Sequence, residues 1–508
     1  MGDYMTLVKF QHVITNDISK RAFLSRPPEP PASILMDDPF KSIYIGITKI
    51  FKVPFMWSFV GLTNPHIAVV GITGAGKSYF VKTFLMRANF VWGTSAVIID
   101  WAGEYKAWVK QSGGHVISLG KGDYLNIMDL SGMKPLDRVK QIITSLEILT
   151  DISDFPEQKR LTEEALEQAY VNKGFNVAEP PQPGSEAPTL KDVITLLQEQ
   201  LQEGTYTYPA ELENSIYRLR QFAREGEDYF ARKSTIDLEK LAQSGLVDLD
   251  LSALPDEHFR ALAALFILQT LKERMRFEGF SETKGLKAFV VLDEAWKIAS
   301  DEKSDAITIV REGRKYQFGL IVASQSPTDI NEVIFSNVGT SFILRIKFER
   351  FLDYIQGSLN FSDFIREEIT KFGVGQAAVE MAFQTSMRFP STFILEKIQG
   401  EEPLYVYKID FSGVLTNAEI SSNVFSKDYE FEKDELRNRI IEYNITPENI
   451  DTLFLKLDAQ KKQMEILDFI NLLVEIGLSK NDIVSFLKEL SLEDVMITRI
   501  ISRAGING

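Results

Sequence analysis

One stretch of the sequence has the residue types and the spacing needed to hold a polyphosphate. Gly71 to Ser78 reads Gly-Ile-Thr-Gly-Ala-Gly-Lys-Ser and fits the pattern G-x-x-x-x-G-K-[ST] at every fixed position. The glycines let the backbone turn tightly, so that its N–H groups point at phosphate oxygens. Lys77 would reach the β- and γ-phosphates, and the Ser78 hydroxyl would ligate Mg²⁺. The residues expected to contact the nucleotide are Gly71, Thr73, Gly74, Ala75, Gly76, Lys77, Ser78 and Tyr79.

The segments on either side of this loop favour the same interpretation. Residues Ile67 to Val70 are an apolar, β-branched run typical of a buried strand, and Tyr79 to Leu85 can continue as a helix. The positive end of such a helix would face the phosphates. A glycine-rich turn without a ligand is the alternative, but the strand–loop–helix context disfavours it. We therefore predict a bound nucleoside triphosphate, ATP, with Mg²⁺.

Two further apolar runs end in carboxylates. Residues 288–293 are apolar and close on Asp293 and Glu294, the Walker B pattern, in which Asp293 would hold Mg²⁺ through water and Glu294 would polarise the attacking water. Residues 95–100 likewise end in Asp100, which, like the nearby Glu104, could orient the metal or the water. The alternative for Asp100 is an aspartate that caps the turn after its strand.

A glutamine and an arginine complete the set of candidate site residues. The apolar run after Gly319 ends in Gln325, whose amide can hydrogen-bond a γ-phosphate or a water molecule. Arg314 lies within Arg-Glu-Gly-Arg-Lys at 311–315. Taken alone, that basic group is best interpreted as a solvated helix end.

These residues need a sheet to bring them together. Buried-strand patterns occur at 67–70, 95–100, 245–251, 288–293, 319–325 and 337–347, and helical patterns lie between them. This alternation predicts an α/β fold with a mainly parallel sheet of about five or six strands. Ligands bind at the carboxyl ends of the strands in such sheets, which is where Asp100, Asp293 and Gln325 are placed.

The pattern changes along the chain predict three parts. Residues 1–40 contain short strands, the clearer at Thr6 to Ile14, and a proline-rich linker, and residues 41–63 add strands to the core. The ATPase core spans 41–425, with a helical subdomain inserted at about 136–245 and a long helix at about 256–276. Residues 426–508 form a helical bundle with helices at about 451–476, 480–490 and 492–503. Docking, oligomerisation and plain packing all remain open for this bundle.

Composition limits the function further. The chain has 508 residues, of which 44% are hydrophobic, and it has no cysteine and four histidines, which excludes disulfides and cysteine-ligated zinc. Its apolar runs are shorter than a membrane span, so we expect a cytoplasmic protein that can dock at the inner face of a membrane through another protein. The net charge of −15 argues against a globally basic nucleic-acid binder but permits a basic channel.

The order of the motifs resembles the HerA/FtsK superfamily of ring-forming DNA-pumping ATPases. The motifs are VVGITGAGKS, VIIDWAGEY, VVLDEAW, REGRK and IVASQSP. The second and fourth resemble the HerA branch, whereas the helical insertion and Ser326 after Gln325 resemble ATPases of conjugation and type IV secretion. The resemblance implies a RecA-like P-loop core, a homo-hexamer with ATP at subunit interfaces, DNA as partner, and an Arg314 that senses the nucleotide.

Three functions compete at this point. The first is an ATP-driven DNA translocase in a transfer or import system. The second is a secretion or pilus-assembly ATPase that acts on protein cargo. A HerA-type helicase in DNA-end processing is a further alternative, which follows from the resemblance. The third is a scaffold that binds ATP and barely hydrolyses it, which the intact pair Asp293 and Glu294 disfavours.

Overall fold

The computed structural model describes 29–37, 42–182, 184–204, 206–236, 245–277, 286–294, 298, 303–359, 361–384, 390–398, 405–410, 425–430, 437–438, 440–443, 445–459, 463–489, 497 and 501. The chain divides into two compact units. The first comprises Met1–Met36, Gly46–Lys82 and Thr94–Ile398, and the second Asp37–Ile45, Thr83–Gly93 and Gln399–Gly508. The strand expected at Thr6 to Ile14 lies outside the described residues.

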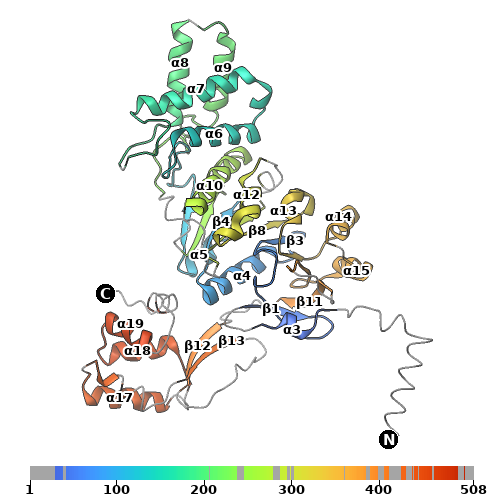
Figure 1. Ribbon diagram of the computed structural model, residues 1–508, viewed down its shortest axis with the longest axis vertical. Coiled ribbons are helices and arrows are strands. Elements are labelled where there is room, and N and C mark those ends of the chain that lie inside the picture. Colours follow the sequence, from blue (N-terminus) through green and yellow to red (C-terminus); the bar gives the residue numbers. More distant parts are fainter. Residues whose placement is uncertain are drawn as a thin grey trace, which may run out of the picture. The chain divides into compact units, whose positions relative to one another are not determined.

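A sheet of 11 strands carries the candidate site residues (Figure 1). Its order is β2-β1-β11-β10-β9-β3-β8-β7-β4-β6-β5. The stretch from β9 to β5 is parallel, and β9, β10, β11 and β1 pair in antiparallel fashion. The strands are β1 (Ile43–Thr48), β2 (Pro54–Trp57), β3 (Ile67–Val70), β4 (Ser95–Asp100), β5 (His115–Ser118), β6 (Leu246–Asp250), β7 (Ala288–Asp293), β8 (Phe318–Ser324), β9 (Thr340–Ile343), β10 (Ala377–Met381) and β11 (Thr392–Ile398).

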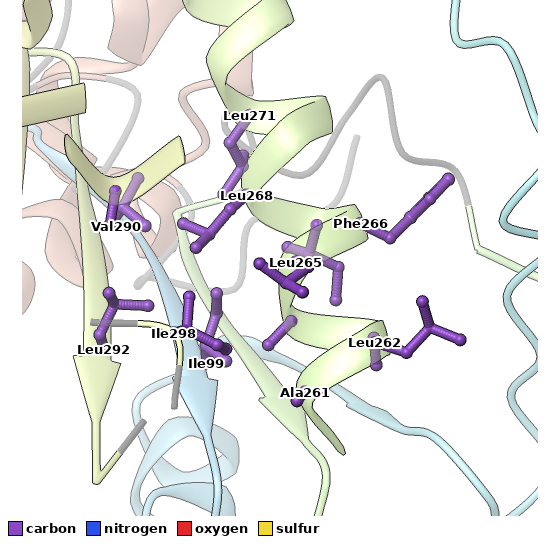
Figure 2. Close-up of a cluster of buried hydrophobic side chains, with 14 of the residues drawn as sticks. Ile99, Ala261, Leu262, Leu265, Phe266, Leu268, Leu271, Val290, Leu292 and Ile298 are labelled. Carbon is purple, nitrogen blue, oxygen red and sulfur yellow. The ribbon is translucent and has the colours of Figure 1, made fainter. Parts of the chain in front are cut away.

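The central strands are apolar throughout because helices cover both faces of a parallel sheet. Side chains of α10 (Glu257–Phe277), among them Leu265 and Leu268, pack against Ile99 of β4 and Val290 of β7 (Figure 2). On the opposite face, Phe80 of α4 (Lys77–Trp92) packs on Phe342 of β9 with ring centroids 4.5 Å apart. The other helices near the sheet are α5 (Lys106–Gln111), α12 (Asp305–Glu312), α13 (Glu332–Ser336), α14 (Glu349–Leu359) and α15 (Asp363–Lys371).

The helices expected within the insertion are present. They are α6 (Pro135–Leu149), α7 (Pro156–Asn172), α8 (Leu190–Glu203) and α9 (Pro209–Arg220), and they form a group beyond α10 in Figure 1. Their start signals lie in the sequence. Proline opens α6, α7 and α9, where a missing N–H costs nothing, and the Asp192 carboxylate accepts the Thr189 N–H at 2.7 Å in a capping box before α8.

Three elements differ from the expectations. β5, a half-buried strand at the edge of the sheet, was not predicted, because its four residues are too short and mixed a run to give a strand pattern. The strand expected at 337–347 is confined to β9, Thr340–Ile343. The pairing of β9 with the antiparallel strands β10 and β11 was also missed, so the sheet is mixed rather than parallel to its edge.

The second unit contains helices and a small sheet. Strands β12 (Tyr405–Asp410), β13 (Phe425–Glu430) and β14 (Gln463–Glu465) pair in the order β13-β12-β14. The single helix expected at about 451–476 was wrong: α17 (Pro447–Ala459) and α18 (Ile466–Glu475) are separated by β14, where a polar run interrupts the apolar spacing. The helix expected at about 480–490 is present as α19 (Lys480–Glu489), and Ser479 and Asp482 hydrogen-bond each other at its start. No helix among the described residues has the length and apolar character to cross a membrane.

Alanine substitutions at two glycines would test how tightly the sheet is packed. A Cβ at Gly319 of β8 would lie 2.4 Å from the ring of Phe289 on the neighbouring strand, whereas a Cβ at Gly357 of α14 meets nothing within 4 Å. Gly319→Ala should therefore destabilise the fold by about 1–3 kcal/mol. Gly357→Ala should stabilise it by roughly 0.5–1 kcal/mol. Thermal melting of both variants checks this, and a lowered midpoint for both would contradict the packing argument.

Candidate nucleotide-binding site

The register of four parallel strands gathers the candidate residues at one edge of the sheet. β8 lies between β3 and β7, and β4 follows β7. The glycine loop follows β3, and Gln325 follows β8. Asp293 ends β7 and is followed by Glu294, and Asp100 ends β4. Asp100 and Asp293 are direct partners in the register. Segments separated by about two hundred residues therefore meet at the carboxyl end of the sheet, as expected from the sequence.

The glycine loop has the conformation that its sequence requires. Gly74 and Gly76 have φ values of 76° and 101°, a region that other residues rarely adopt. The Gly71 N–H donates to the Ser324 carbonyl at 3.2 Å, and a Cβ at Gly71 would lie 2.8 Å from Leu344 Cβ. The ends of β8 and β9 thus hold the start of the loop, and α4 begins directly after it, at Lys77.

Lys77 is turned back onto the loop. Its side chain is 6% exposed, and its Nζ lies 3.0 Å from the Gly71 carbonyl oxygen and 3.2 Å from Glu294 Oε1. Glu294 has a φ of 55°, which is unusual for a residue with a Cβ and is held by its N–H donating to the Ala323 carbonyl at 3.0 Å. The cation of the loop and the carboxylate after β7 are therefore in direct contact.

Gln325 and Thr73 connect the loop to β8. The Thr73 hydroxyl donates to Gln325 Oε1 at 2.8 Å. Both side chains are exposed, as is that of Tyr79 after Ser78. Gln325 therefore contacts the loop, and a direct contact of its amide with a γ-phosphate stays a prediction.

Asp293 has the properties of a magnesium ligand. Its side chain is 4% exposed, and its Oδ1 has no hydrogen-bond partner. Burial, followed by the neighbouring carboxylates of Glu294 and Glu104, raises the pKa of Asp293 to about 7, whereas Tyr105 and Lys77 lower it. A divalent cation would satisfy this oxygen and restore the ionised form, so Asp293 together with Ser78 fits Mg²⁺. No cluster of three or more metal-ligating side chains occurs within the described ranges.

Asp100 holds the turn that follows its strand. Its Oδ1 accepts the N–H groups of Ala102 at 3.2 Å and Gly103 at 2.8 Å, and its Oδ2 accepts that of Tyr105 at 2.8 Å. Burial raises the pKa of Asp100, and these backbone donors oppose the shift. The geometry corresponds to the turn-capping alternative, and a direct role of Asp100 toward metal or water stays a prediction.

Sequence reasoning missed an acidic group beside this turn. Asp250 at the end of β6 pairs in register with Asp100 and accepts from Lys106 Nζ at 3.0 Å. Asp248, two residues earlier on the same face, is fully buried, and both its oxygens lack an ordinary hydrogen bond. Burial and the nearby Asp100 and Asp250 raise the pKa of Asp248 to about 8. The alternation Leu-Val-Asp-Leu-Asp in β6 was the signal that could have revealed it.

Arg314 lies away from the other candidates. It belongs to the short 3-10 helix η4 (Gly313–Tyr316), which precedes β8, and its guanidinium donates to the carbonyl of Thr63, which precedes β3. Both segments are at the amino end of the sheet. β8 has seven residues, which span roughly 20 Å at ~3.3 Å each. The structure therefore does not bring Arg314 to the nucleotide loop of its own chain.

Comparison with known proteins identifies relatives of this core. The sequence model described as "Helicase HerA, central domain" matches residues 47–271. The DNA double-strand break repair helicase HerA of Pyrococcus furiosus is 26% identical over 370 residues, which cover 63% of each protein, so the match spans less than two thirds of that relative.

Solved structures with the same fold include two proteins. VirB4 of Thermoanaerobacter pseudethanolicus superposes with a TM-score of 0.59 at 21% identity and covers 72% of this chain and 98% of VirB4. The plasmid coupling protein TrwB in complex with the ATP analogue ADPNP superposes with a TM-score of 0.50 at 11% identity. This match covers 73% of the present chain and 93% of TrwB. The structural similarities confirm the predicted RecA-like P-loop ATPase fold, and the sequence matches confirm the resemblance to HerA helicases.

The buried Asp248 should make the stability of the fold depend on pH. Because its pKa in the folded state lies above the ordinary value, its contribution to stability is present at low pH and is lost as pH rises through about 8. Asp248→Asn has no proton to lose. The melting temperature of the variant relative to the wild type should therefore rise between pH 5 and pH 9. A difference that stays constant over this range would contradict a proton held on Asp248.

Proposed function

We propose that the protein, whose nucleotide core is similar to the central domain of HerA helicases, is an ATP-driven DNA translocase that works as a hexamer. The ATPase part of this proposal is supported best by the contact of Lys77, in a complete phosphate loop, with Glu294 at 3.2 Å. A scaffold that only binds ATP needs the lysine but has no use for a carboxylate at this position. A motor needs both.

The residues of the site have separate tasks in this mechanism. ATP would supply the phosphoanhydride bond that is broken, and Mg²⁺ would neutralise negative charge on its phosphate oxygens. The loop N–H groups and Lys77 would hold the phosphates, and Ser78 and Asp293 would hold the metal. Glu294, once Lys77 has turned to the phosphates, is free to orient water and accept its proton. Gln325 contacts Thr73 of the loop and would register the loss of the γ-phosphate.

The position of Arg314 supports a ring. A basic side chain that serves the transferring phosphoryl group must reach it, and roughly 20 Å of β8 separates Arg314 from the loop of its own chain. A neighbouring subunit that presents its amino-terminal sheet edge to the loop would supply the arginine in trans. Such arginines contribute ~10³–10⁵ in rate where they act in GTPases.

DNA is the cargo that the relatives favour. The HerA relative is named a DNA repair helicase, and TrwB is named a plasmid coupling protein. A net charge of −15 means that this chain can hold DNA only where cations gather, as on pore loops that recur in every subunit of a ring. Protein cargo in a secretion or pilus-assembly system is the second candidate, favoured by the likeness of the core to VirB4. Docking to a membrane transfer apparatus through another protein belongs to the same proposal.

Glu294→Gln separates binding from chemistry. The amide keeps the size and the hydrogen bonding of the side chain but cannot accept a proton, so ATP affinity should persist while turnover falls by ~10²–10⁴. Nucleotide binding and phosphate release measured on the same preparation check this, with Glu164→Gln on α7 as the exposed control. A collapse of affinity together with turnover would assign Glu294 a structural or metal-binding role instead.

DNA should stimulate the wild-type protein. Turnover is expected to rise when DNA is added at low salt, and binding should weaken with salt with a log–log slope of about −0.7 to −0.9 per neutralised phosphate. Lys77→Ala is the control and should hydrolyse ATP neither with nor without DNA. If single- and double-stranded DNA both fail to bind and to stimulate the assembled protein, the protein-cargo candidate replaces this proposal.

A further inference from the structure

Tyr105 has a buried hydroxyl at the metal-binding edge of the site. The side chain has 0% exposure, and its hydroxyl faces the Asp293 carboxylate and the Ser78 hydroxyl. The Tyr105 hydroxyl makes no hydrogen bond of ordinary geometry, and neither does Oδ1 of the Asp293 carboxylate that it faces. Two unsatisfied buried polar atoms therefore belong to this pair of side chains, at the place where the metal ligands meet. Such atoms cost free energy unless a ligand or a rearrangement completes their hydrogen bonds.

The backbone at Tyr105 is held firmly. Its N–H donates to Asp100 Oδ2 at 2.8 Å, so the end of β4 fixes the position of the turn. Gly103 within the turn has a φ of 79°, and a Cβ there would lie 2.9 Å from Ser252 Oγ, which explains the glycine. A hydroxyl that points at the metal site from so rigid a turn is placed there by the fold.

The ring is held from α4 as well. Lys82, one turn after Ser78, donates to the Glu104 carbonyl at 2.7 Å, and its Nζ lies 4.9 Å from the centre of the Tyr105 ring. Trp108 of α5 packs edge-to-face with the Tyr105 ring, with ring centroids 6.4 Å apart. The helix that carries Ser78 and the turn that carries Tyr105 are therefore tied together directly.

We infer that Tyr105 is a positioning residue for Mg²⁺, whose hydroxyl orients the Asp293 carboxylate and the Ser78 hydroxyl toward the metal. The inference rests on the proposed nucleotide site. With the metal bound, the O–H would donate to the carboxylate, and the phenolic oxygen would accept from Ser78. This arrangement stabilises the ionised carboxylate and leaves its remaining lone pairs for the metal or its water. It also gives Asp100 an indirect role, because Asp100 fixes the turn that presents Tyr105.

A role limited to packing predicts a different result, and Tyr105→Phe distinguishes the two. The phenylalanine keeps the ring, its contact with Lys82 and its contact with Trp108, and removes only the hydroxyl. Tyr170→Phe is the matched control. Tyr170 of α7 is also fully buried, and its hydroxyl donates to the Met128 carbonyl within the first unit, away from the nucleotide loop.

The measurement is the binding of a fluorescent, non-hydrolysable ATP analogue to the full chain, titrated with Mg²⁺ and repeated in EDTA. For Tyr105→Phe, the half-saturating Mg²⁺ concentration should rise by ~10–100-fold, the usual effect of losing a residue that supports a metal ligand. Binding in EDTA should stay within about twofold of the wild type, because the contacts of the loop with the phosphates are unchanged. Tyr170→Phe should match the wild type in both titrations.

The outcomes separate the inference from the proposed function. An unchanged Mg²⁺ dependence in Tyr105→Phe, with the analogue still bound, overturns the inference alone. A wild-type protein that binds no analogue overturns the proposed nucleotide site and the inference with it. If Tyr105→Phe does not fold, Lys82→Met loosens the same turn without touching the hydroxyl, and the same shift toward higher Mg²⁺ is expected. An unshifted titration of that variant also overturns the inference.

Discussion

The register of the central parallel strands is the constraint on which the rest of the site depends. Hydrogen bonds between β3, β8, β7 and β4 fix the level at which each strand ends. A shift of one residue in β7 would turn Asp293 to the other face of the sheet, toward α10, because side chains alternate along a strand. The apolar packing of α10 on Ile99, Val290 and Leu292 prevents this shift (Figure 2). The core thus positions the chemistry by excluding every other register.

The same sheet buries several carboxylates, and this has a cost. Asp293 and Asp248 lie on one face with Asp100 and Asp250, and burial raises the pKa of the first two to about 7 and about 8. Carboxyl groups this close cannot all be ionised in a medium of low polarity. Each carboxylate is stabilised in a different way. Backbone N–H groups donate to Asp100, whereas the side chains of Lys106 and Ser252 donate to Asp250. Asp248 keeps its proton at neutral pH, because its pKa is about 8. Asp293 is left for an external cation.

Much of this arrangement could be predicted from the sequence. The glycine loop and the strands that end in Asp100 and Asp293 are local patterns, because their residues are neighbours in the chain and their spacing is set by backbone geometry. The order of the strands, the antiparallel extension and β5 could not be read in this way, since pairing between distant segments leaves no periodic trace. Tyr105 was missed for a related reason. Its importance comes from Ser78 and Asp293, which lie on two other elements.

The unusual backbone of Glu294 suggests how the site is prepared for ATP. A residue with a Cβ at a φ of 55° costs of order 1–3 kcal/mol, which the surroundings must offset. The hydrogen bond to Ala323 and the contact with Lys77 are available for this. Phosphates would compete for Lys77 and remove one of these two supports, so nucleotide binding and the conformation of Glu294 are energetically coupled. Ala323 belongs to β8, the strand directly before Gln325, so the backbone of Glu294 is hydrogen-bonded to the strand that leads to the residue contacting Thr73 of the loop.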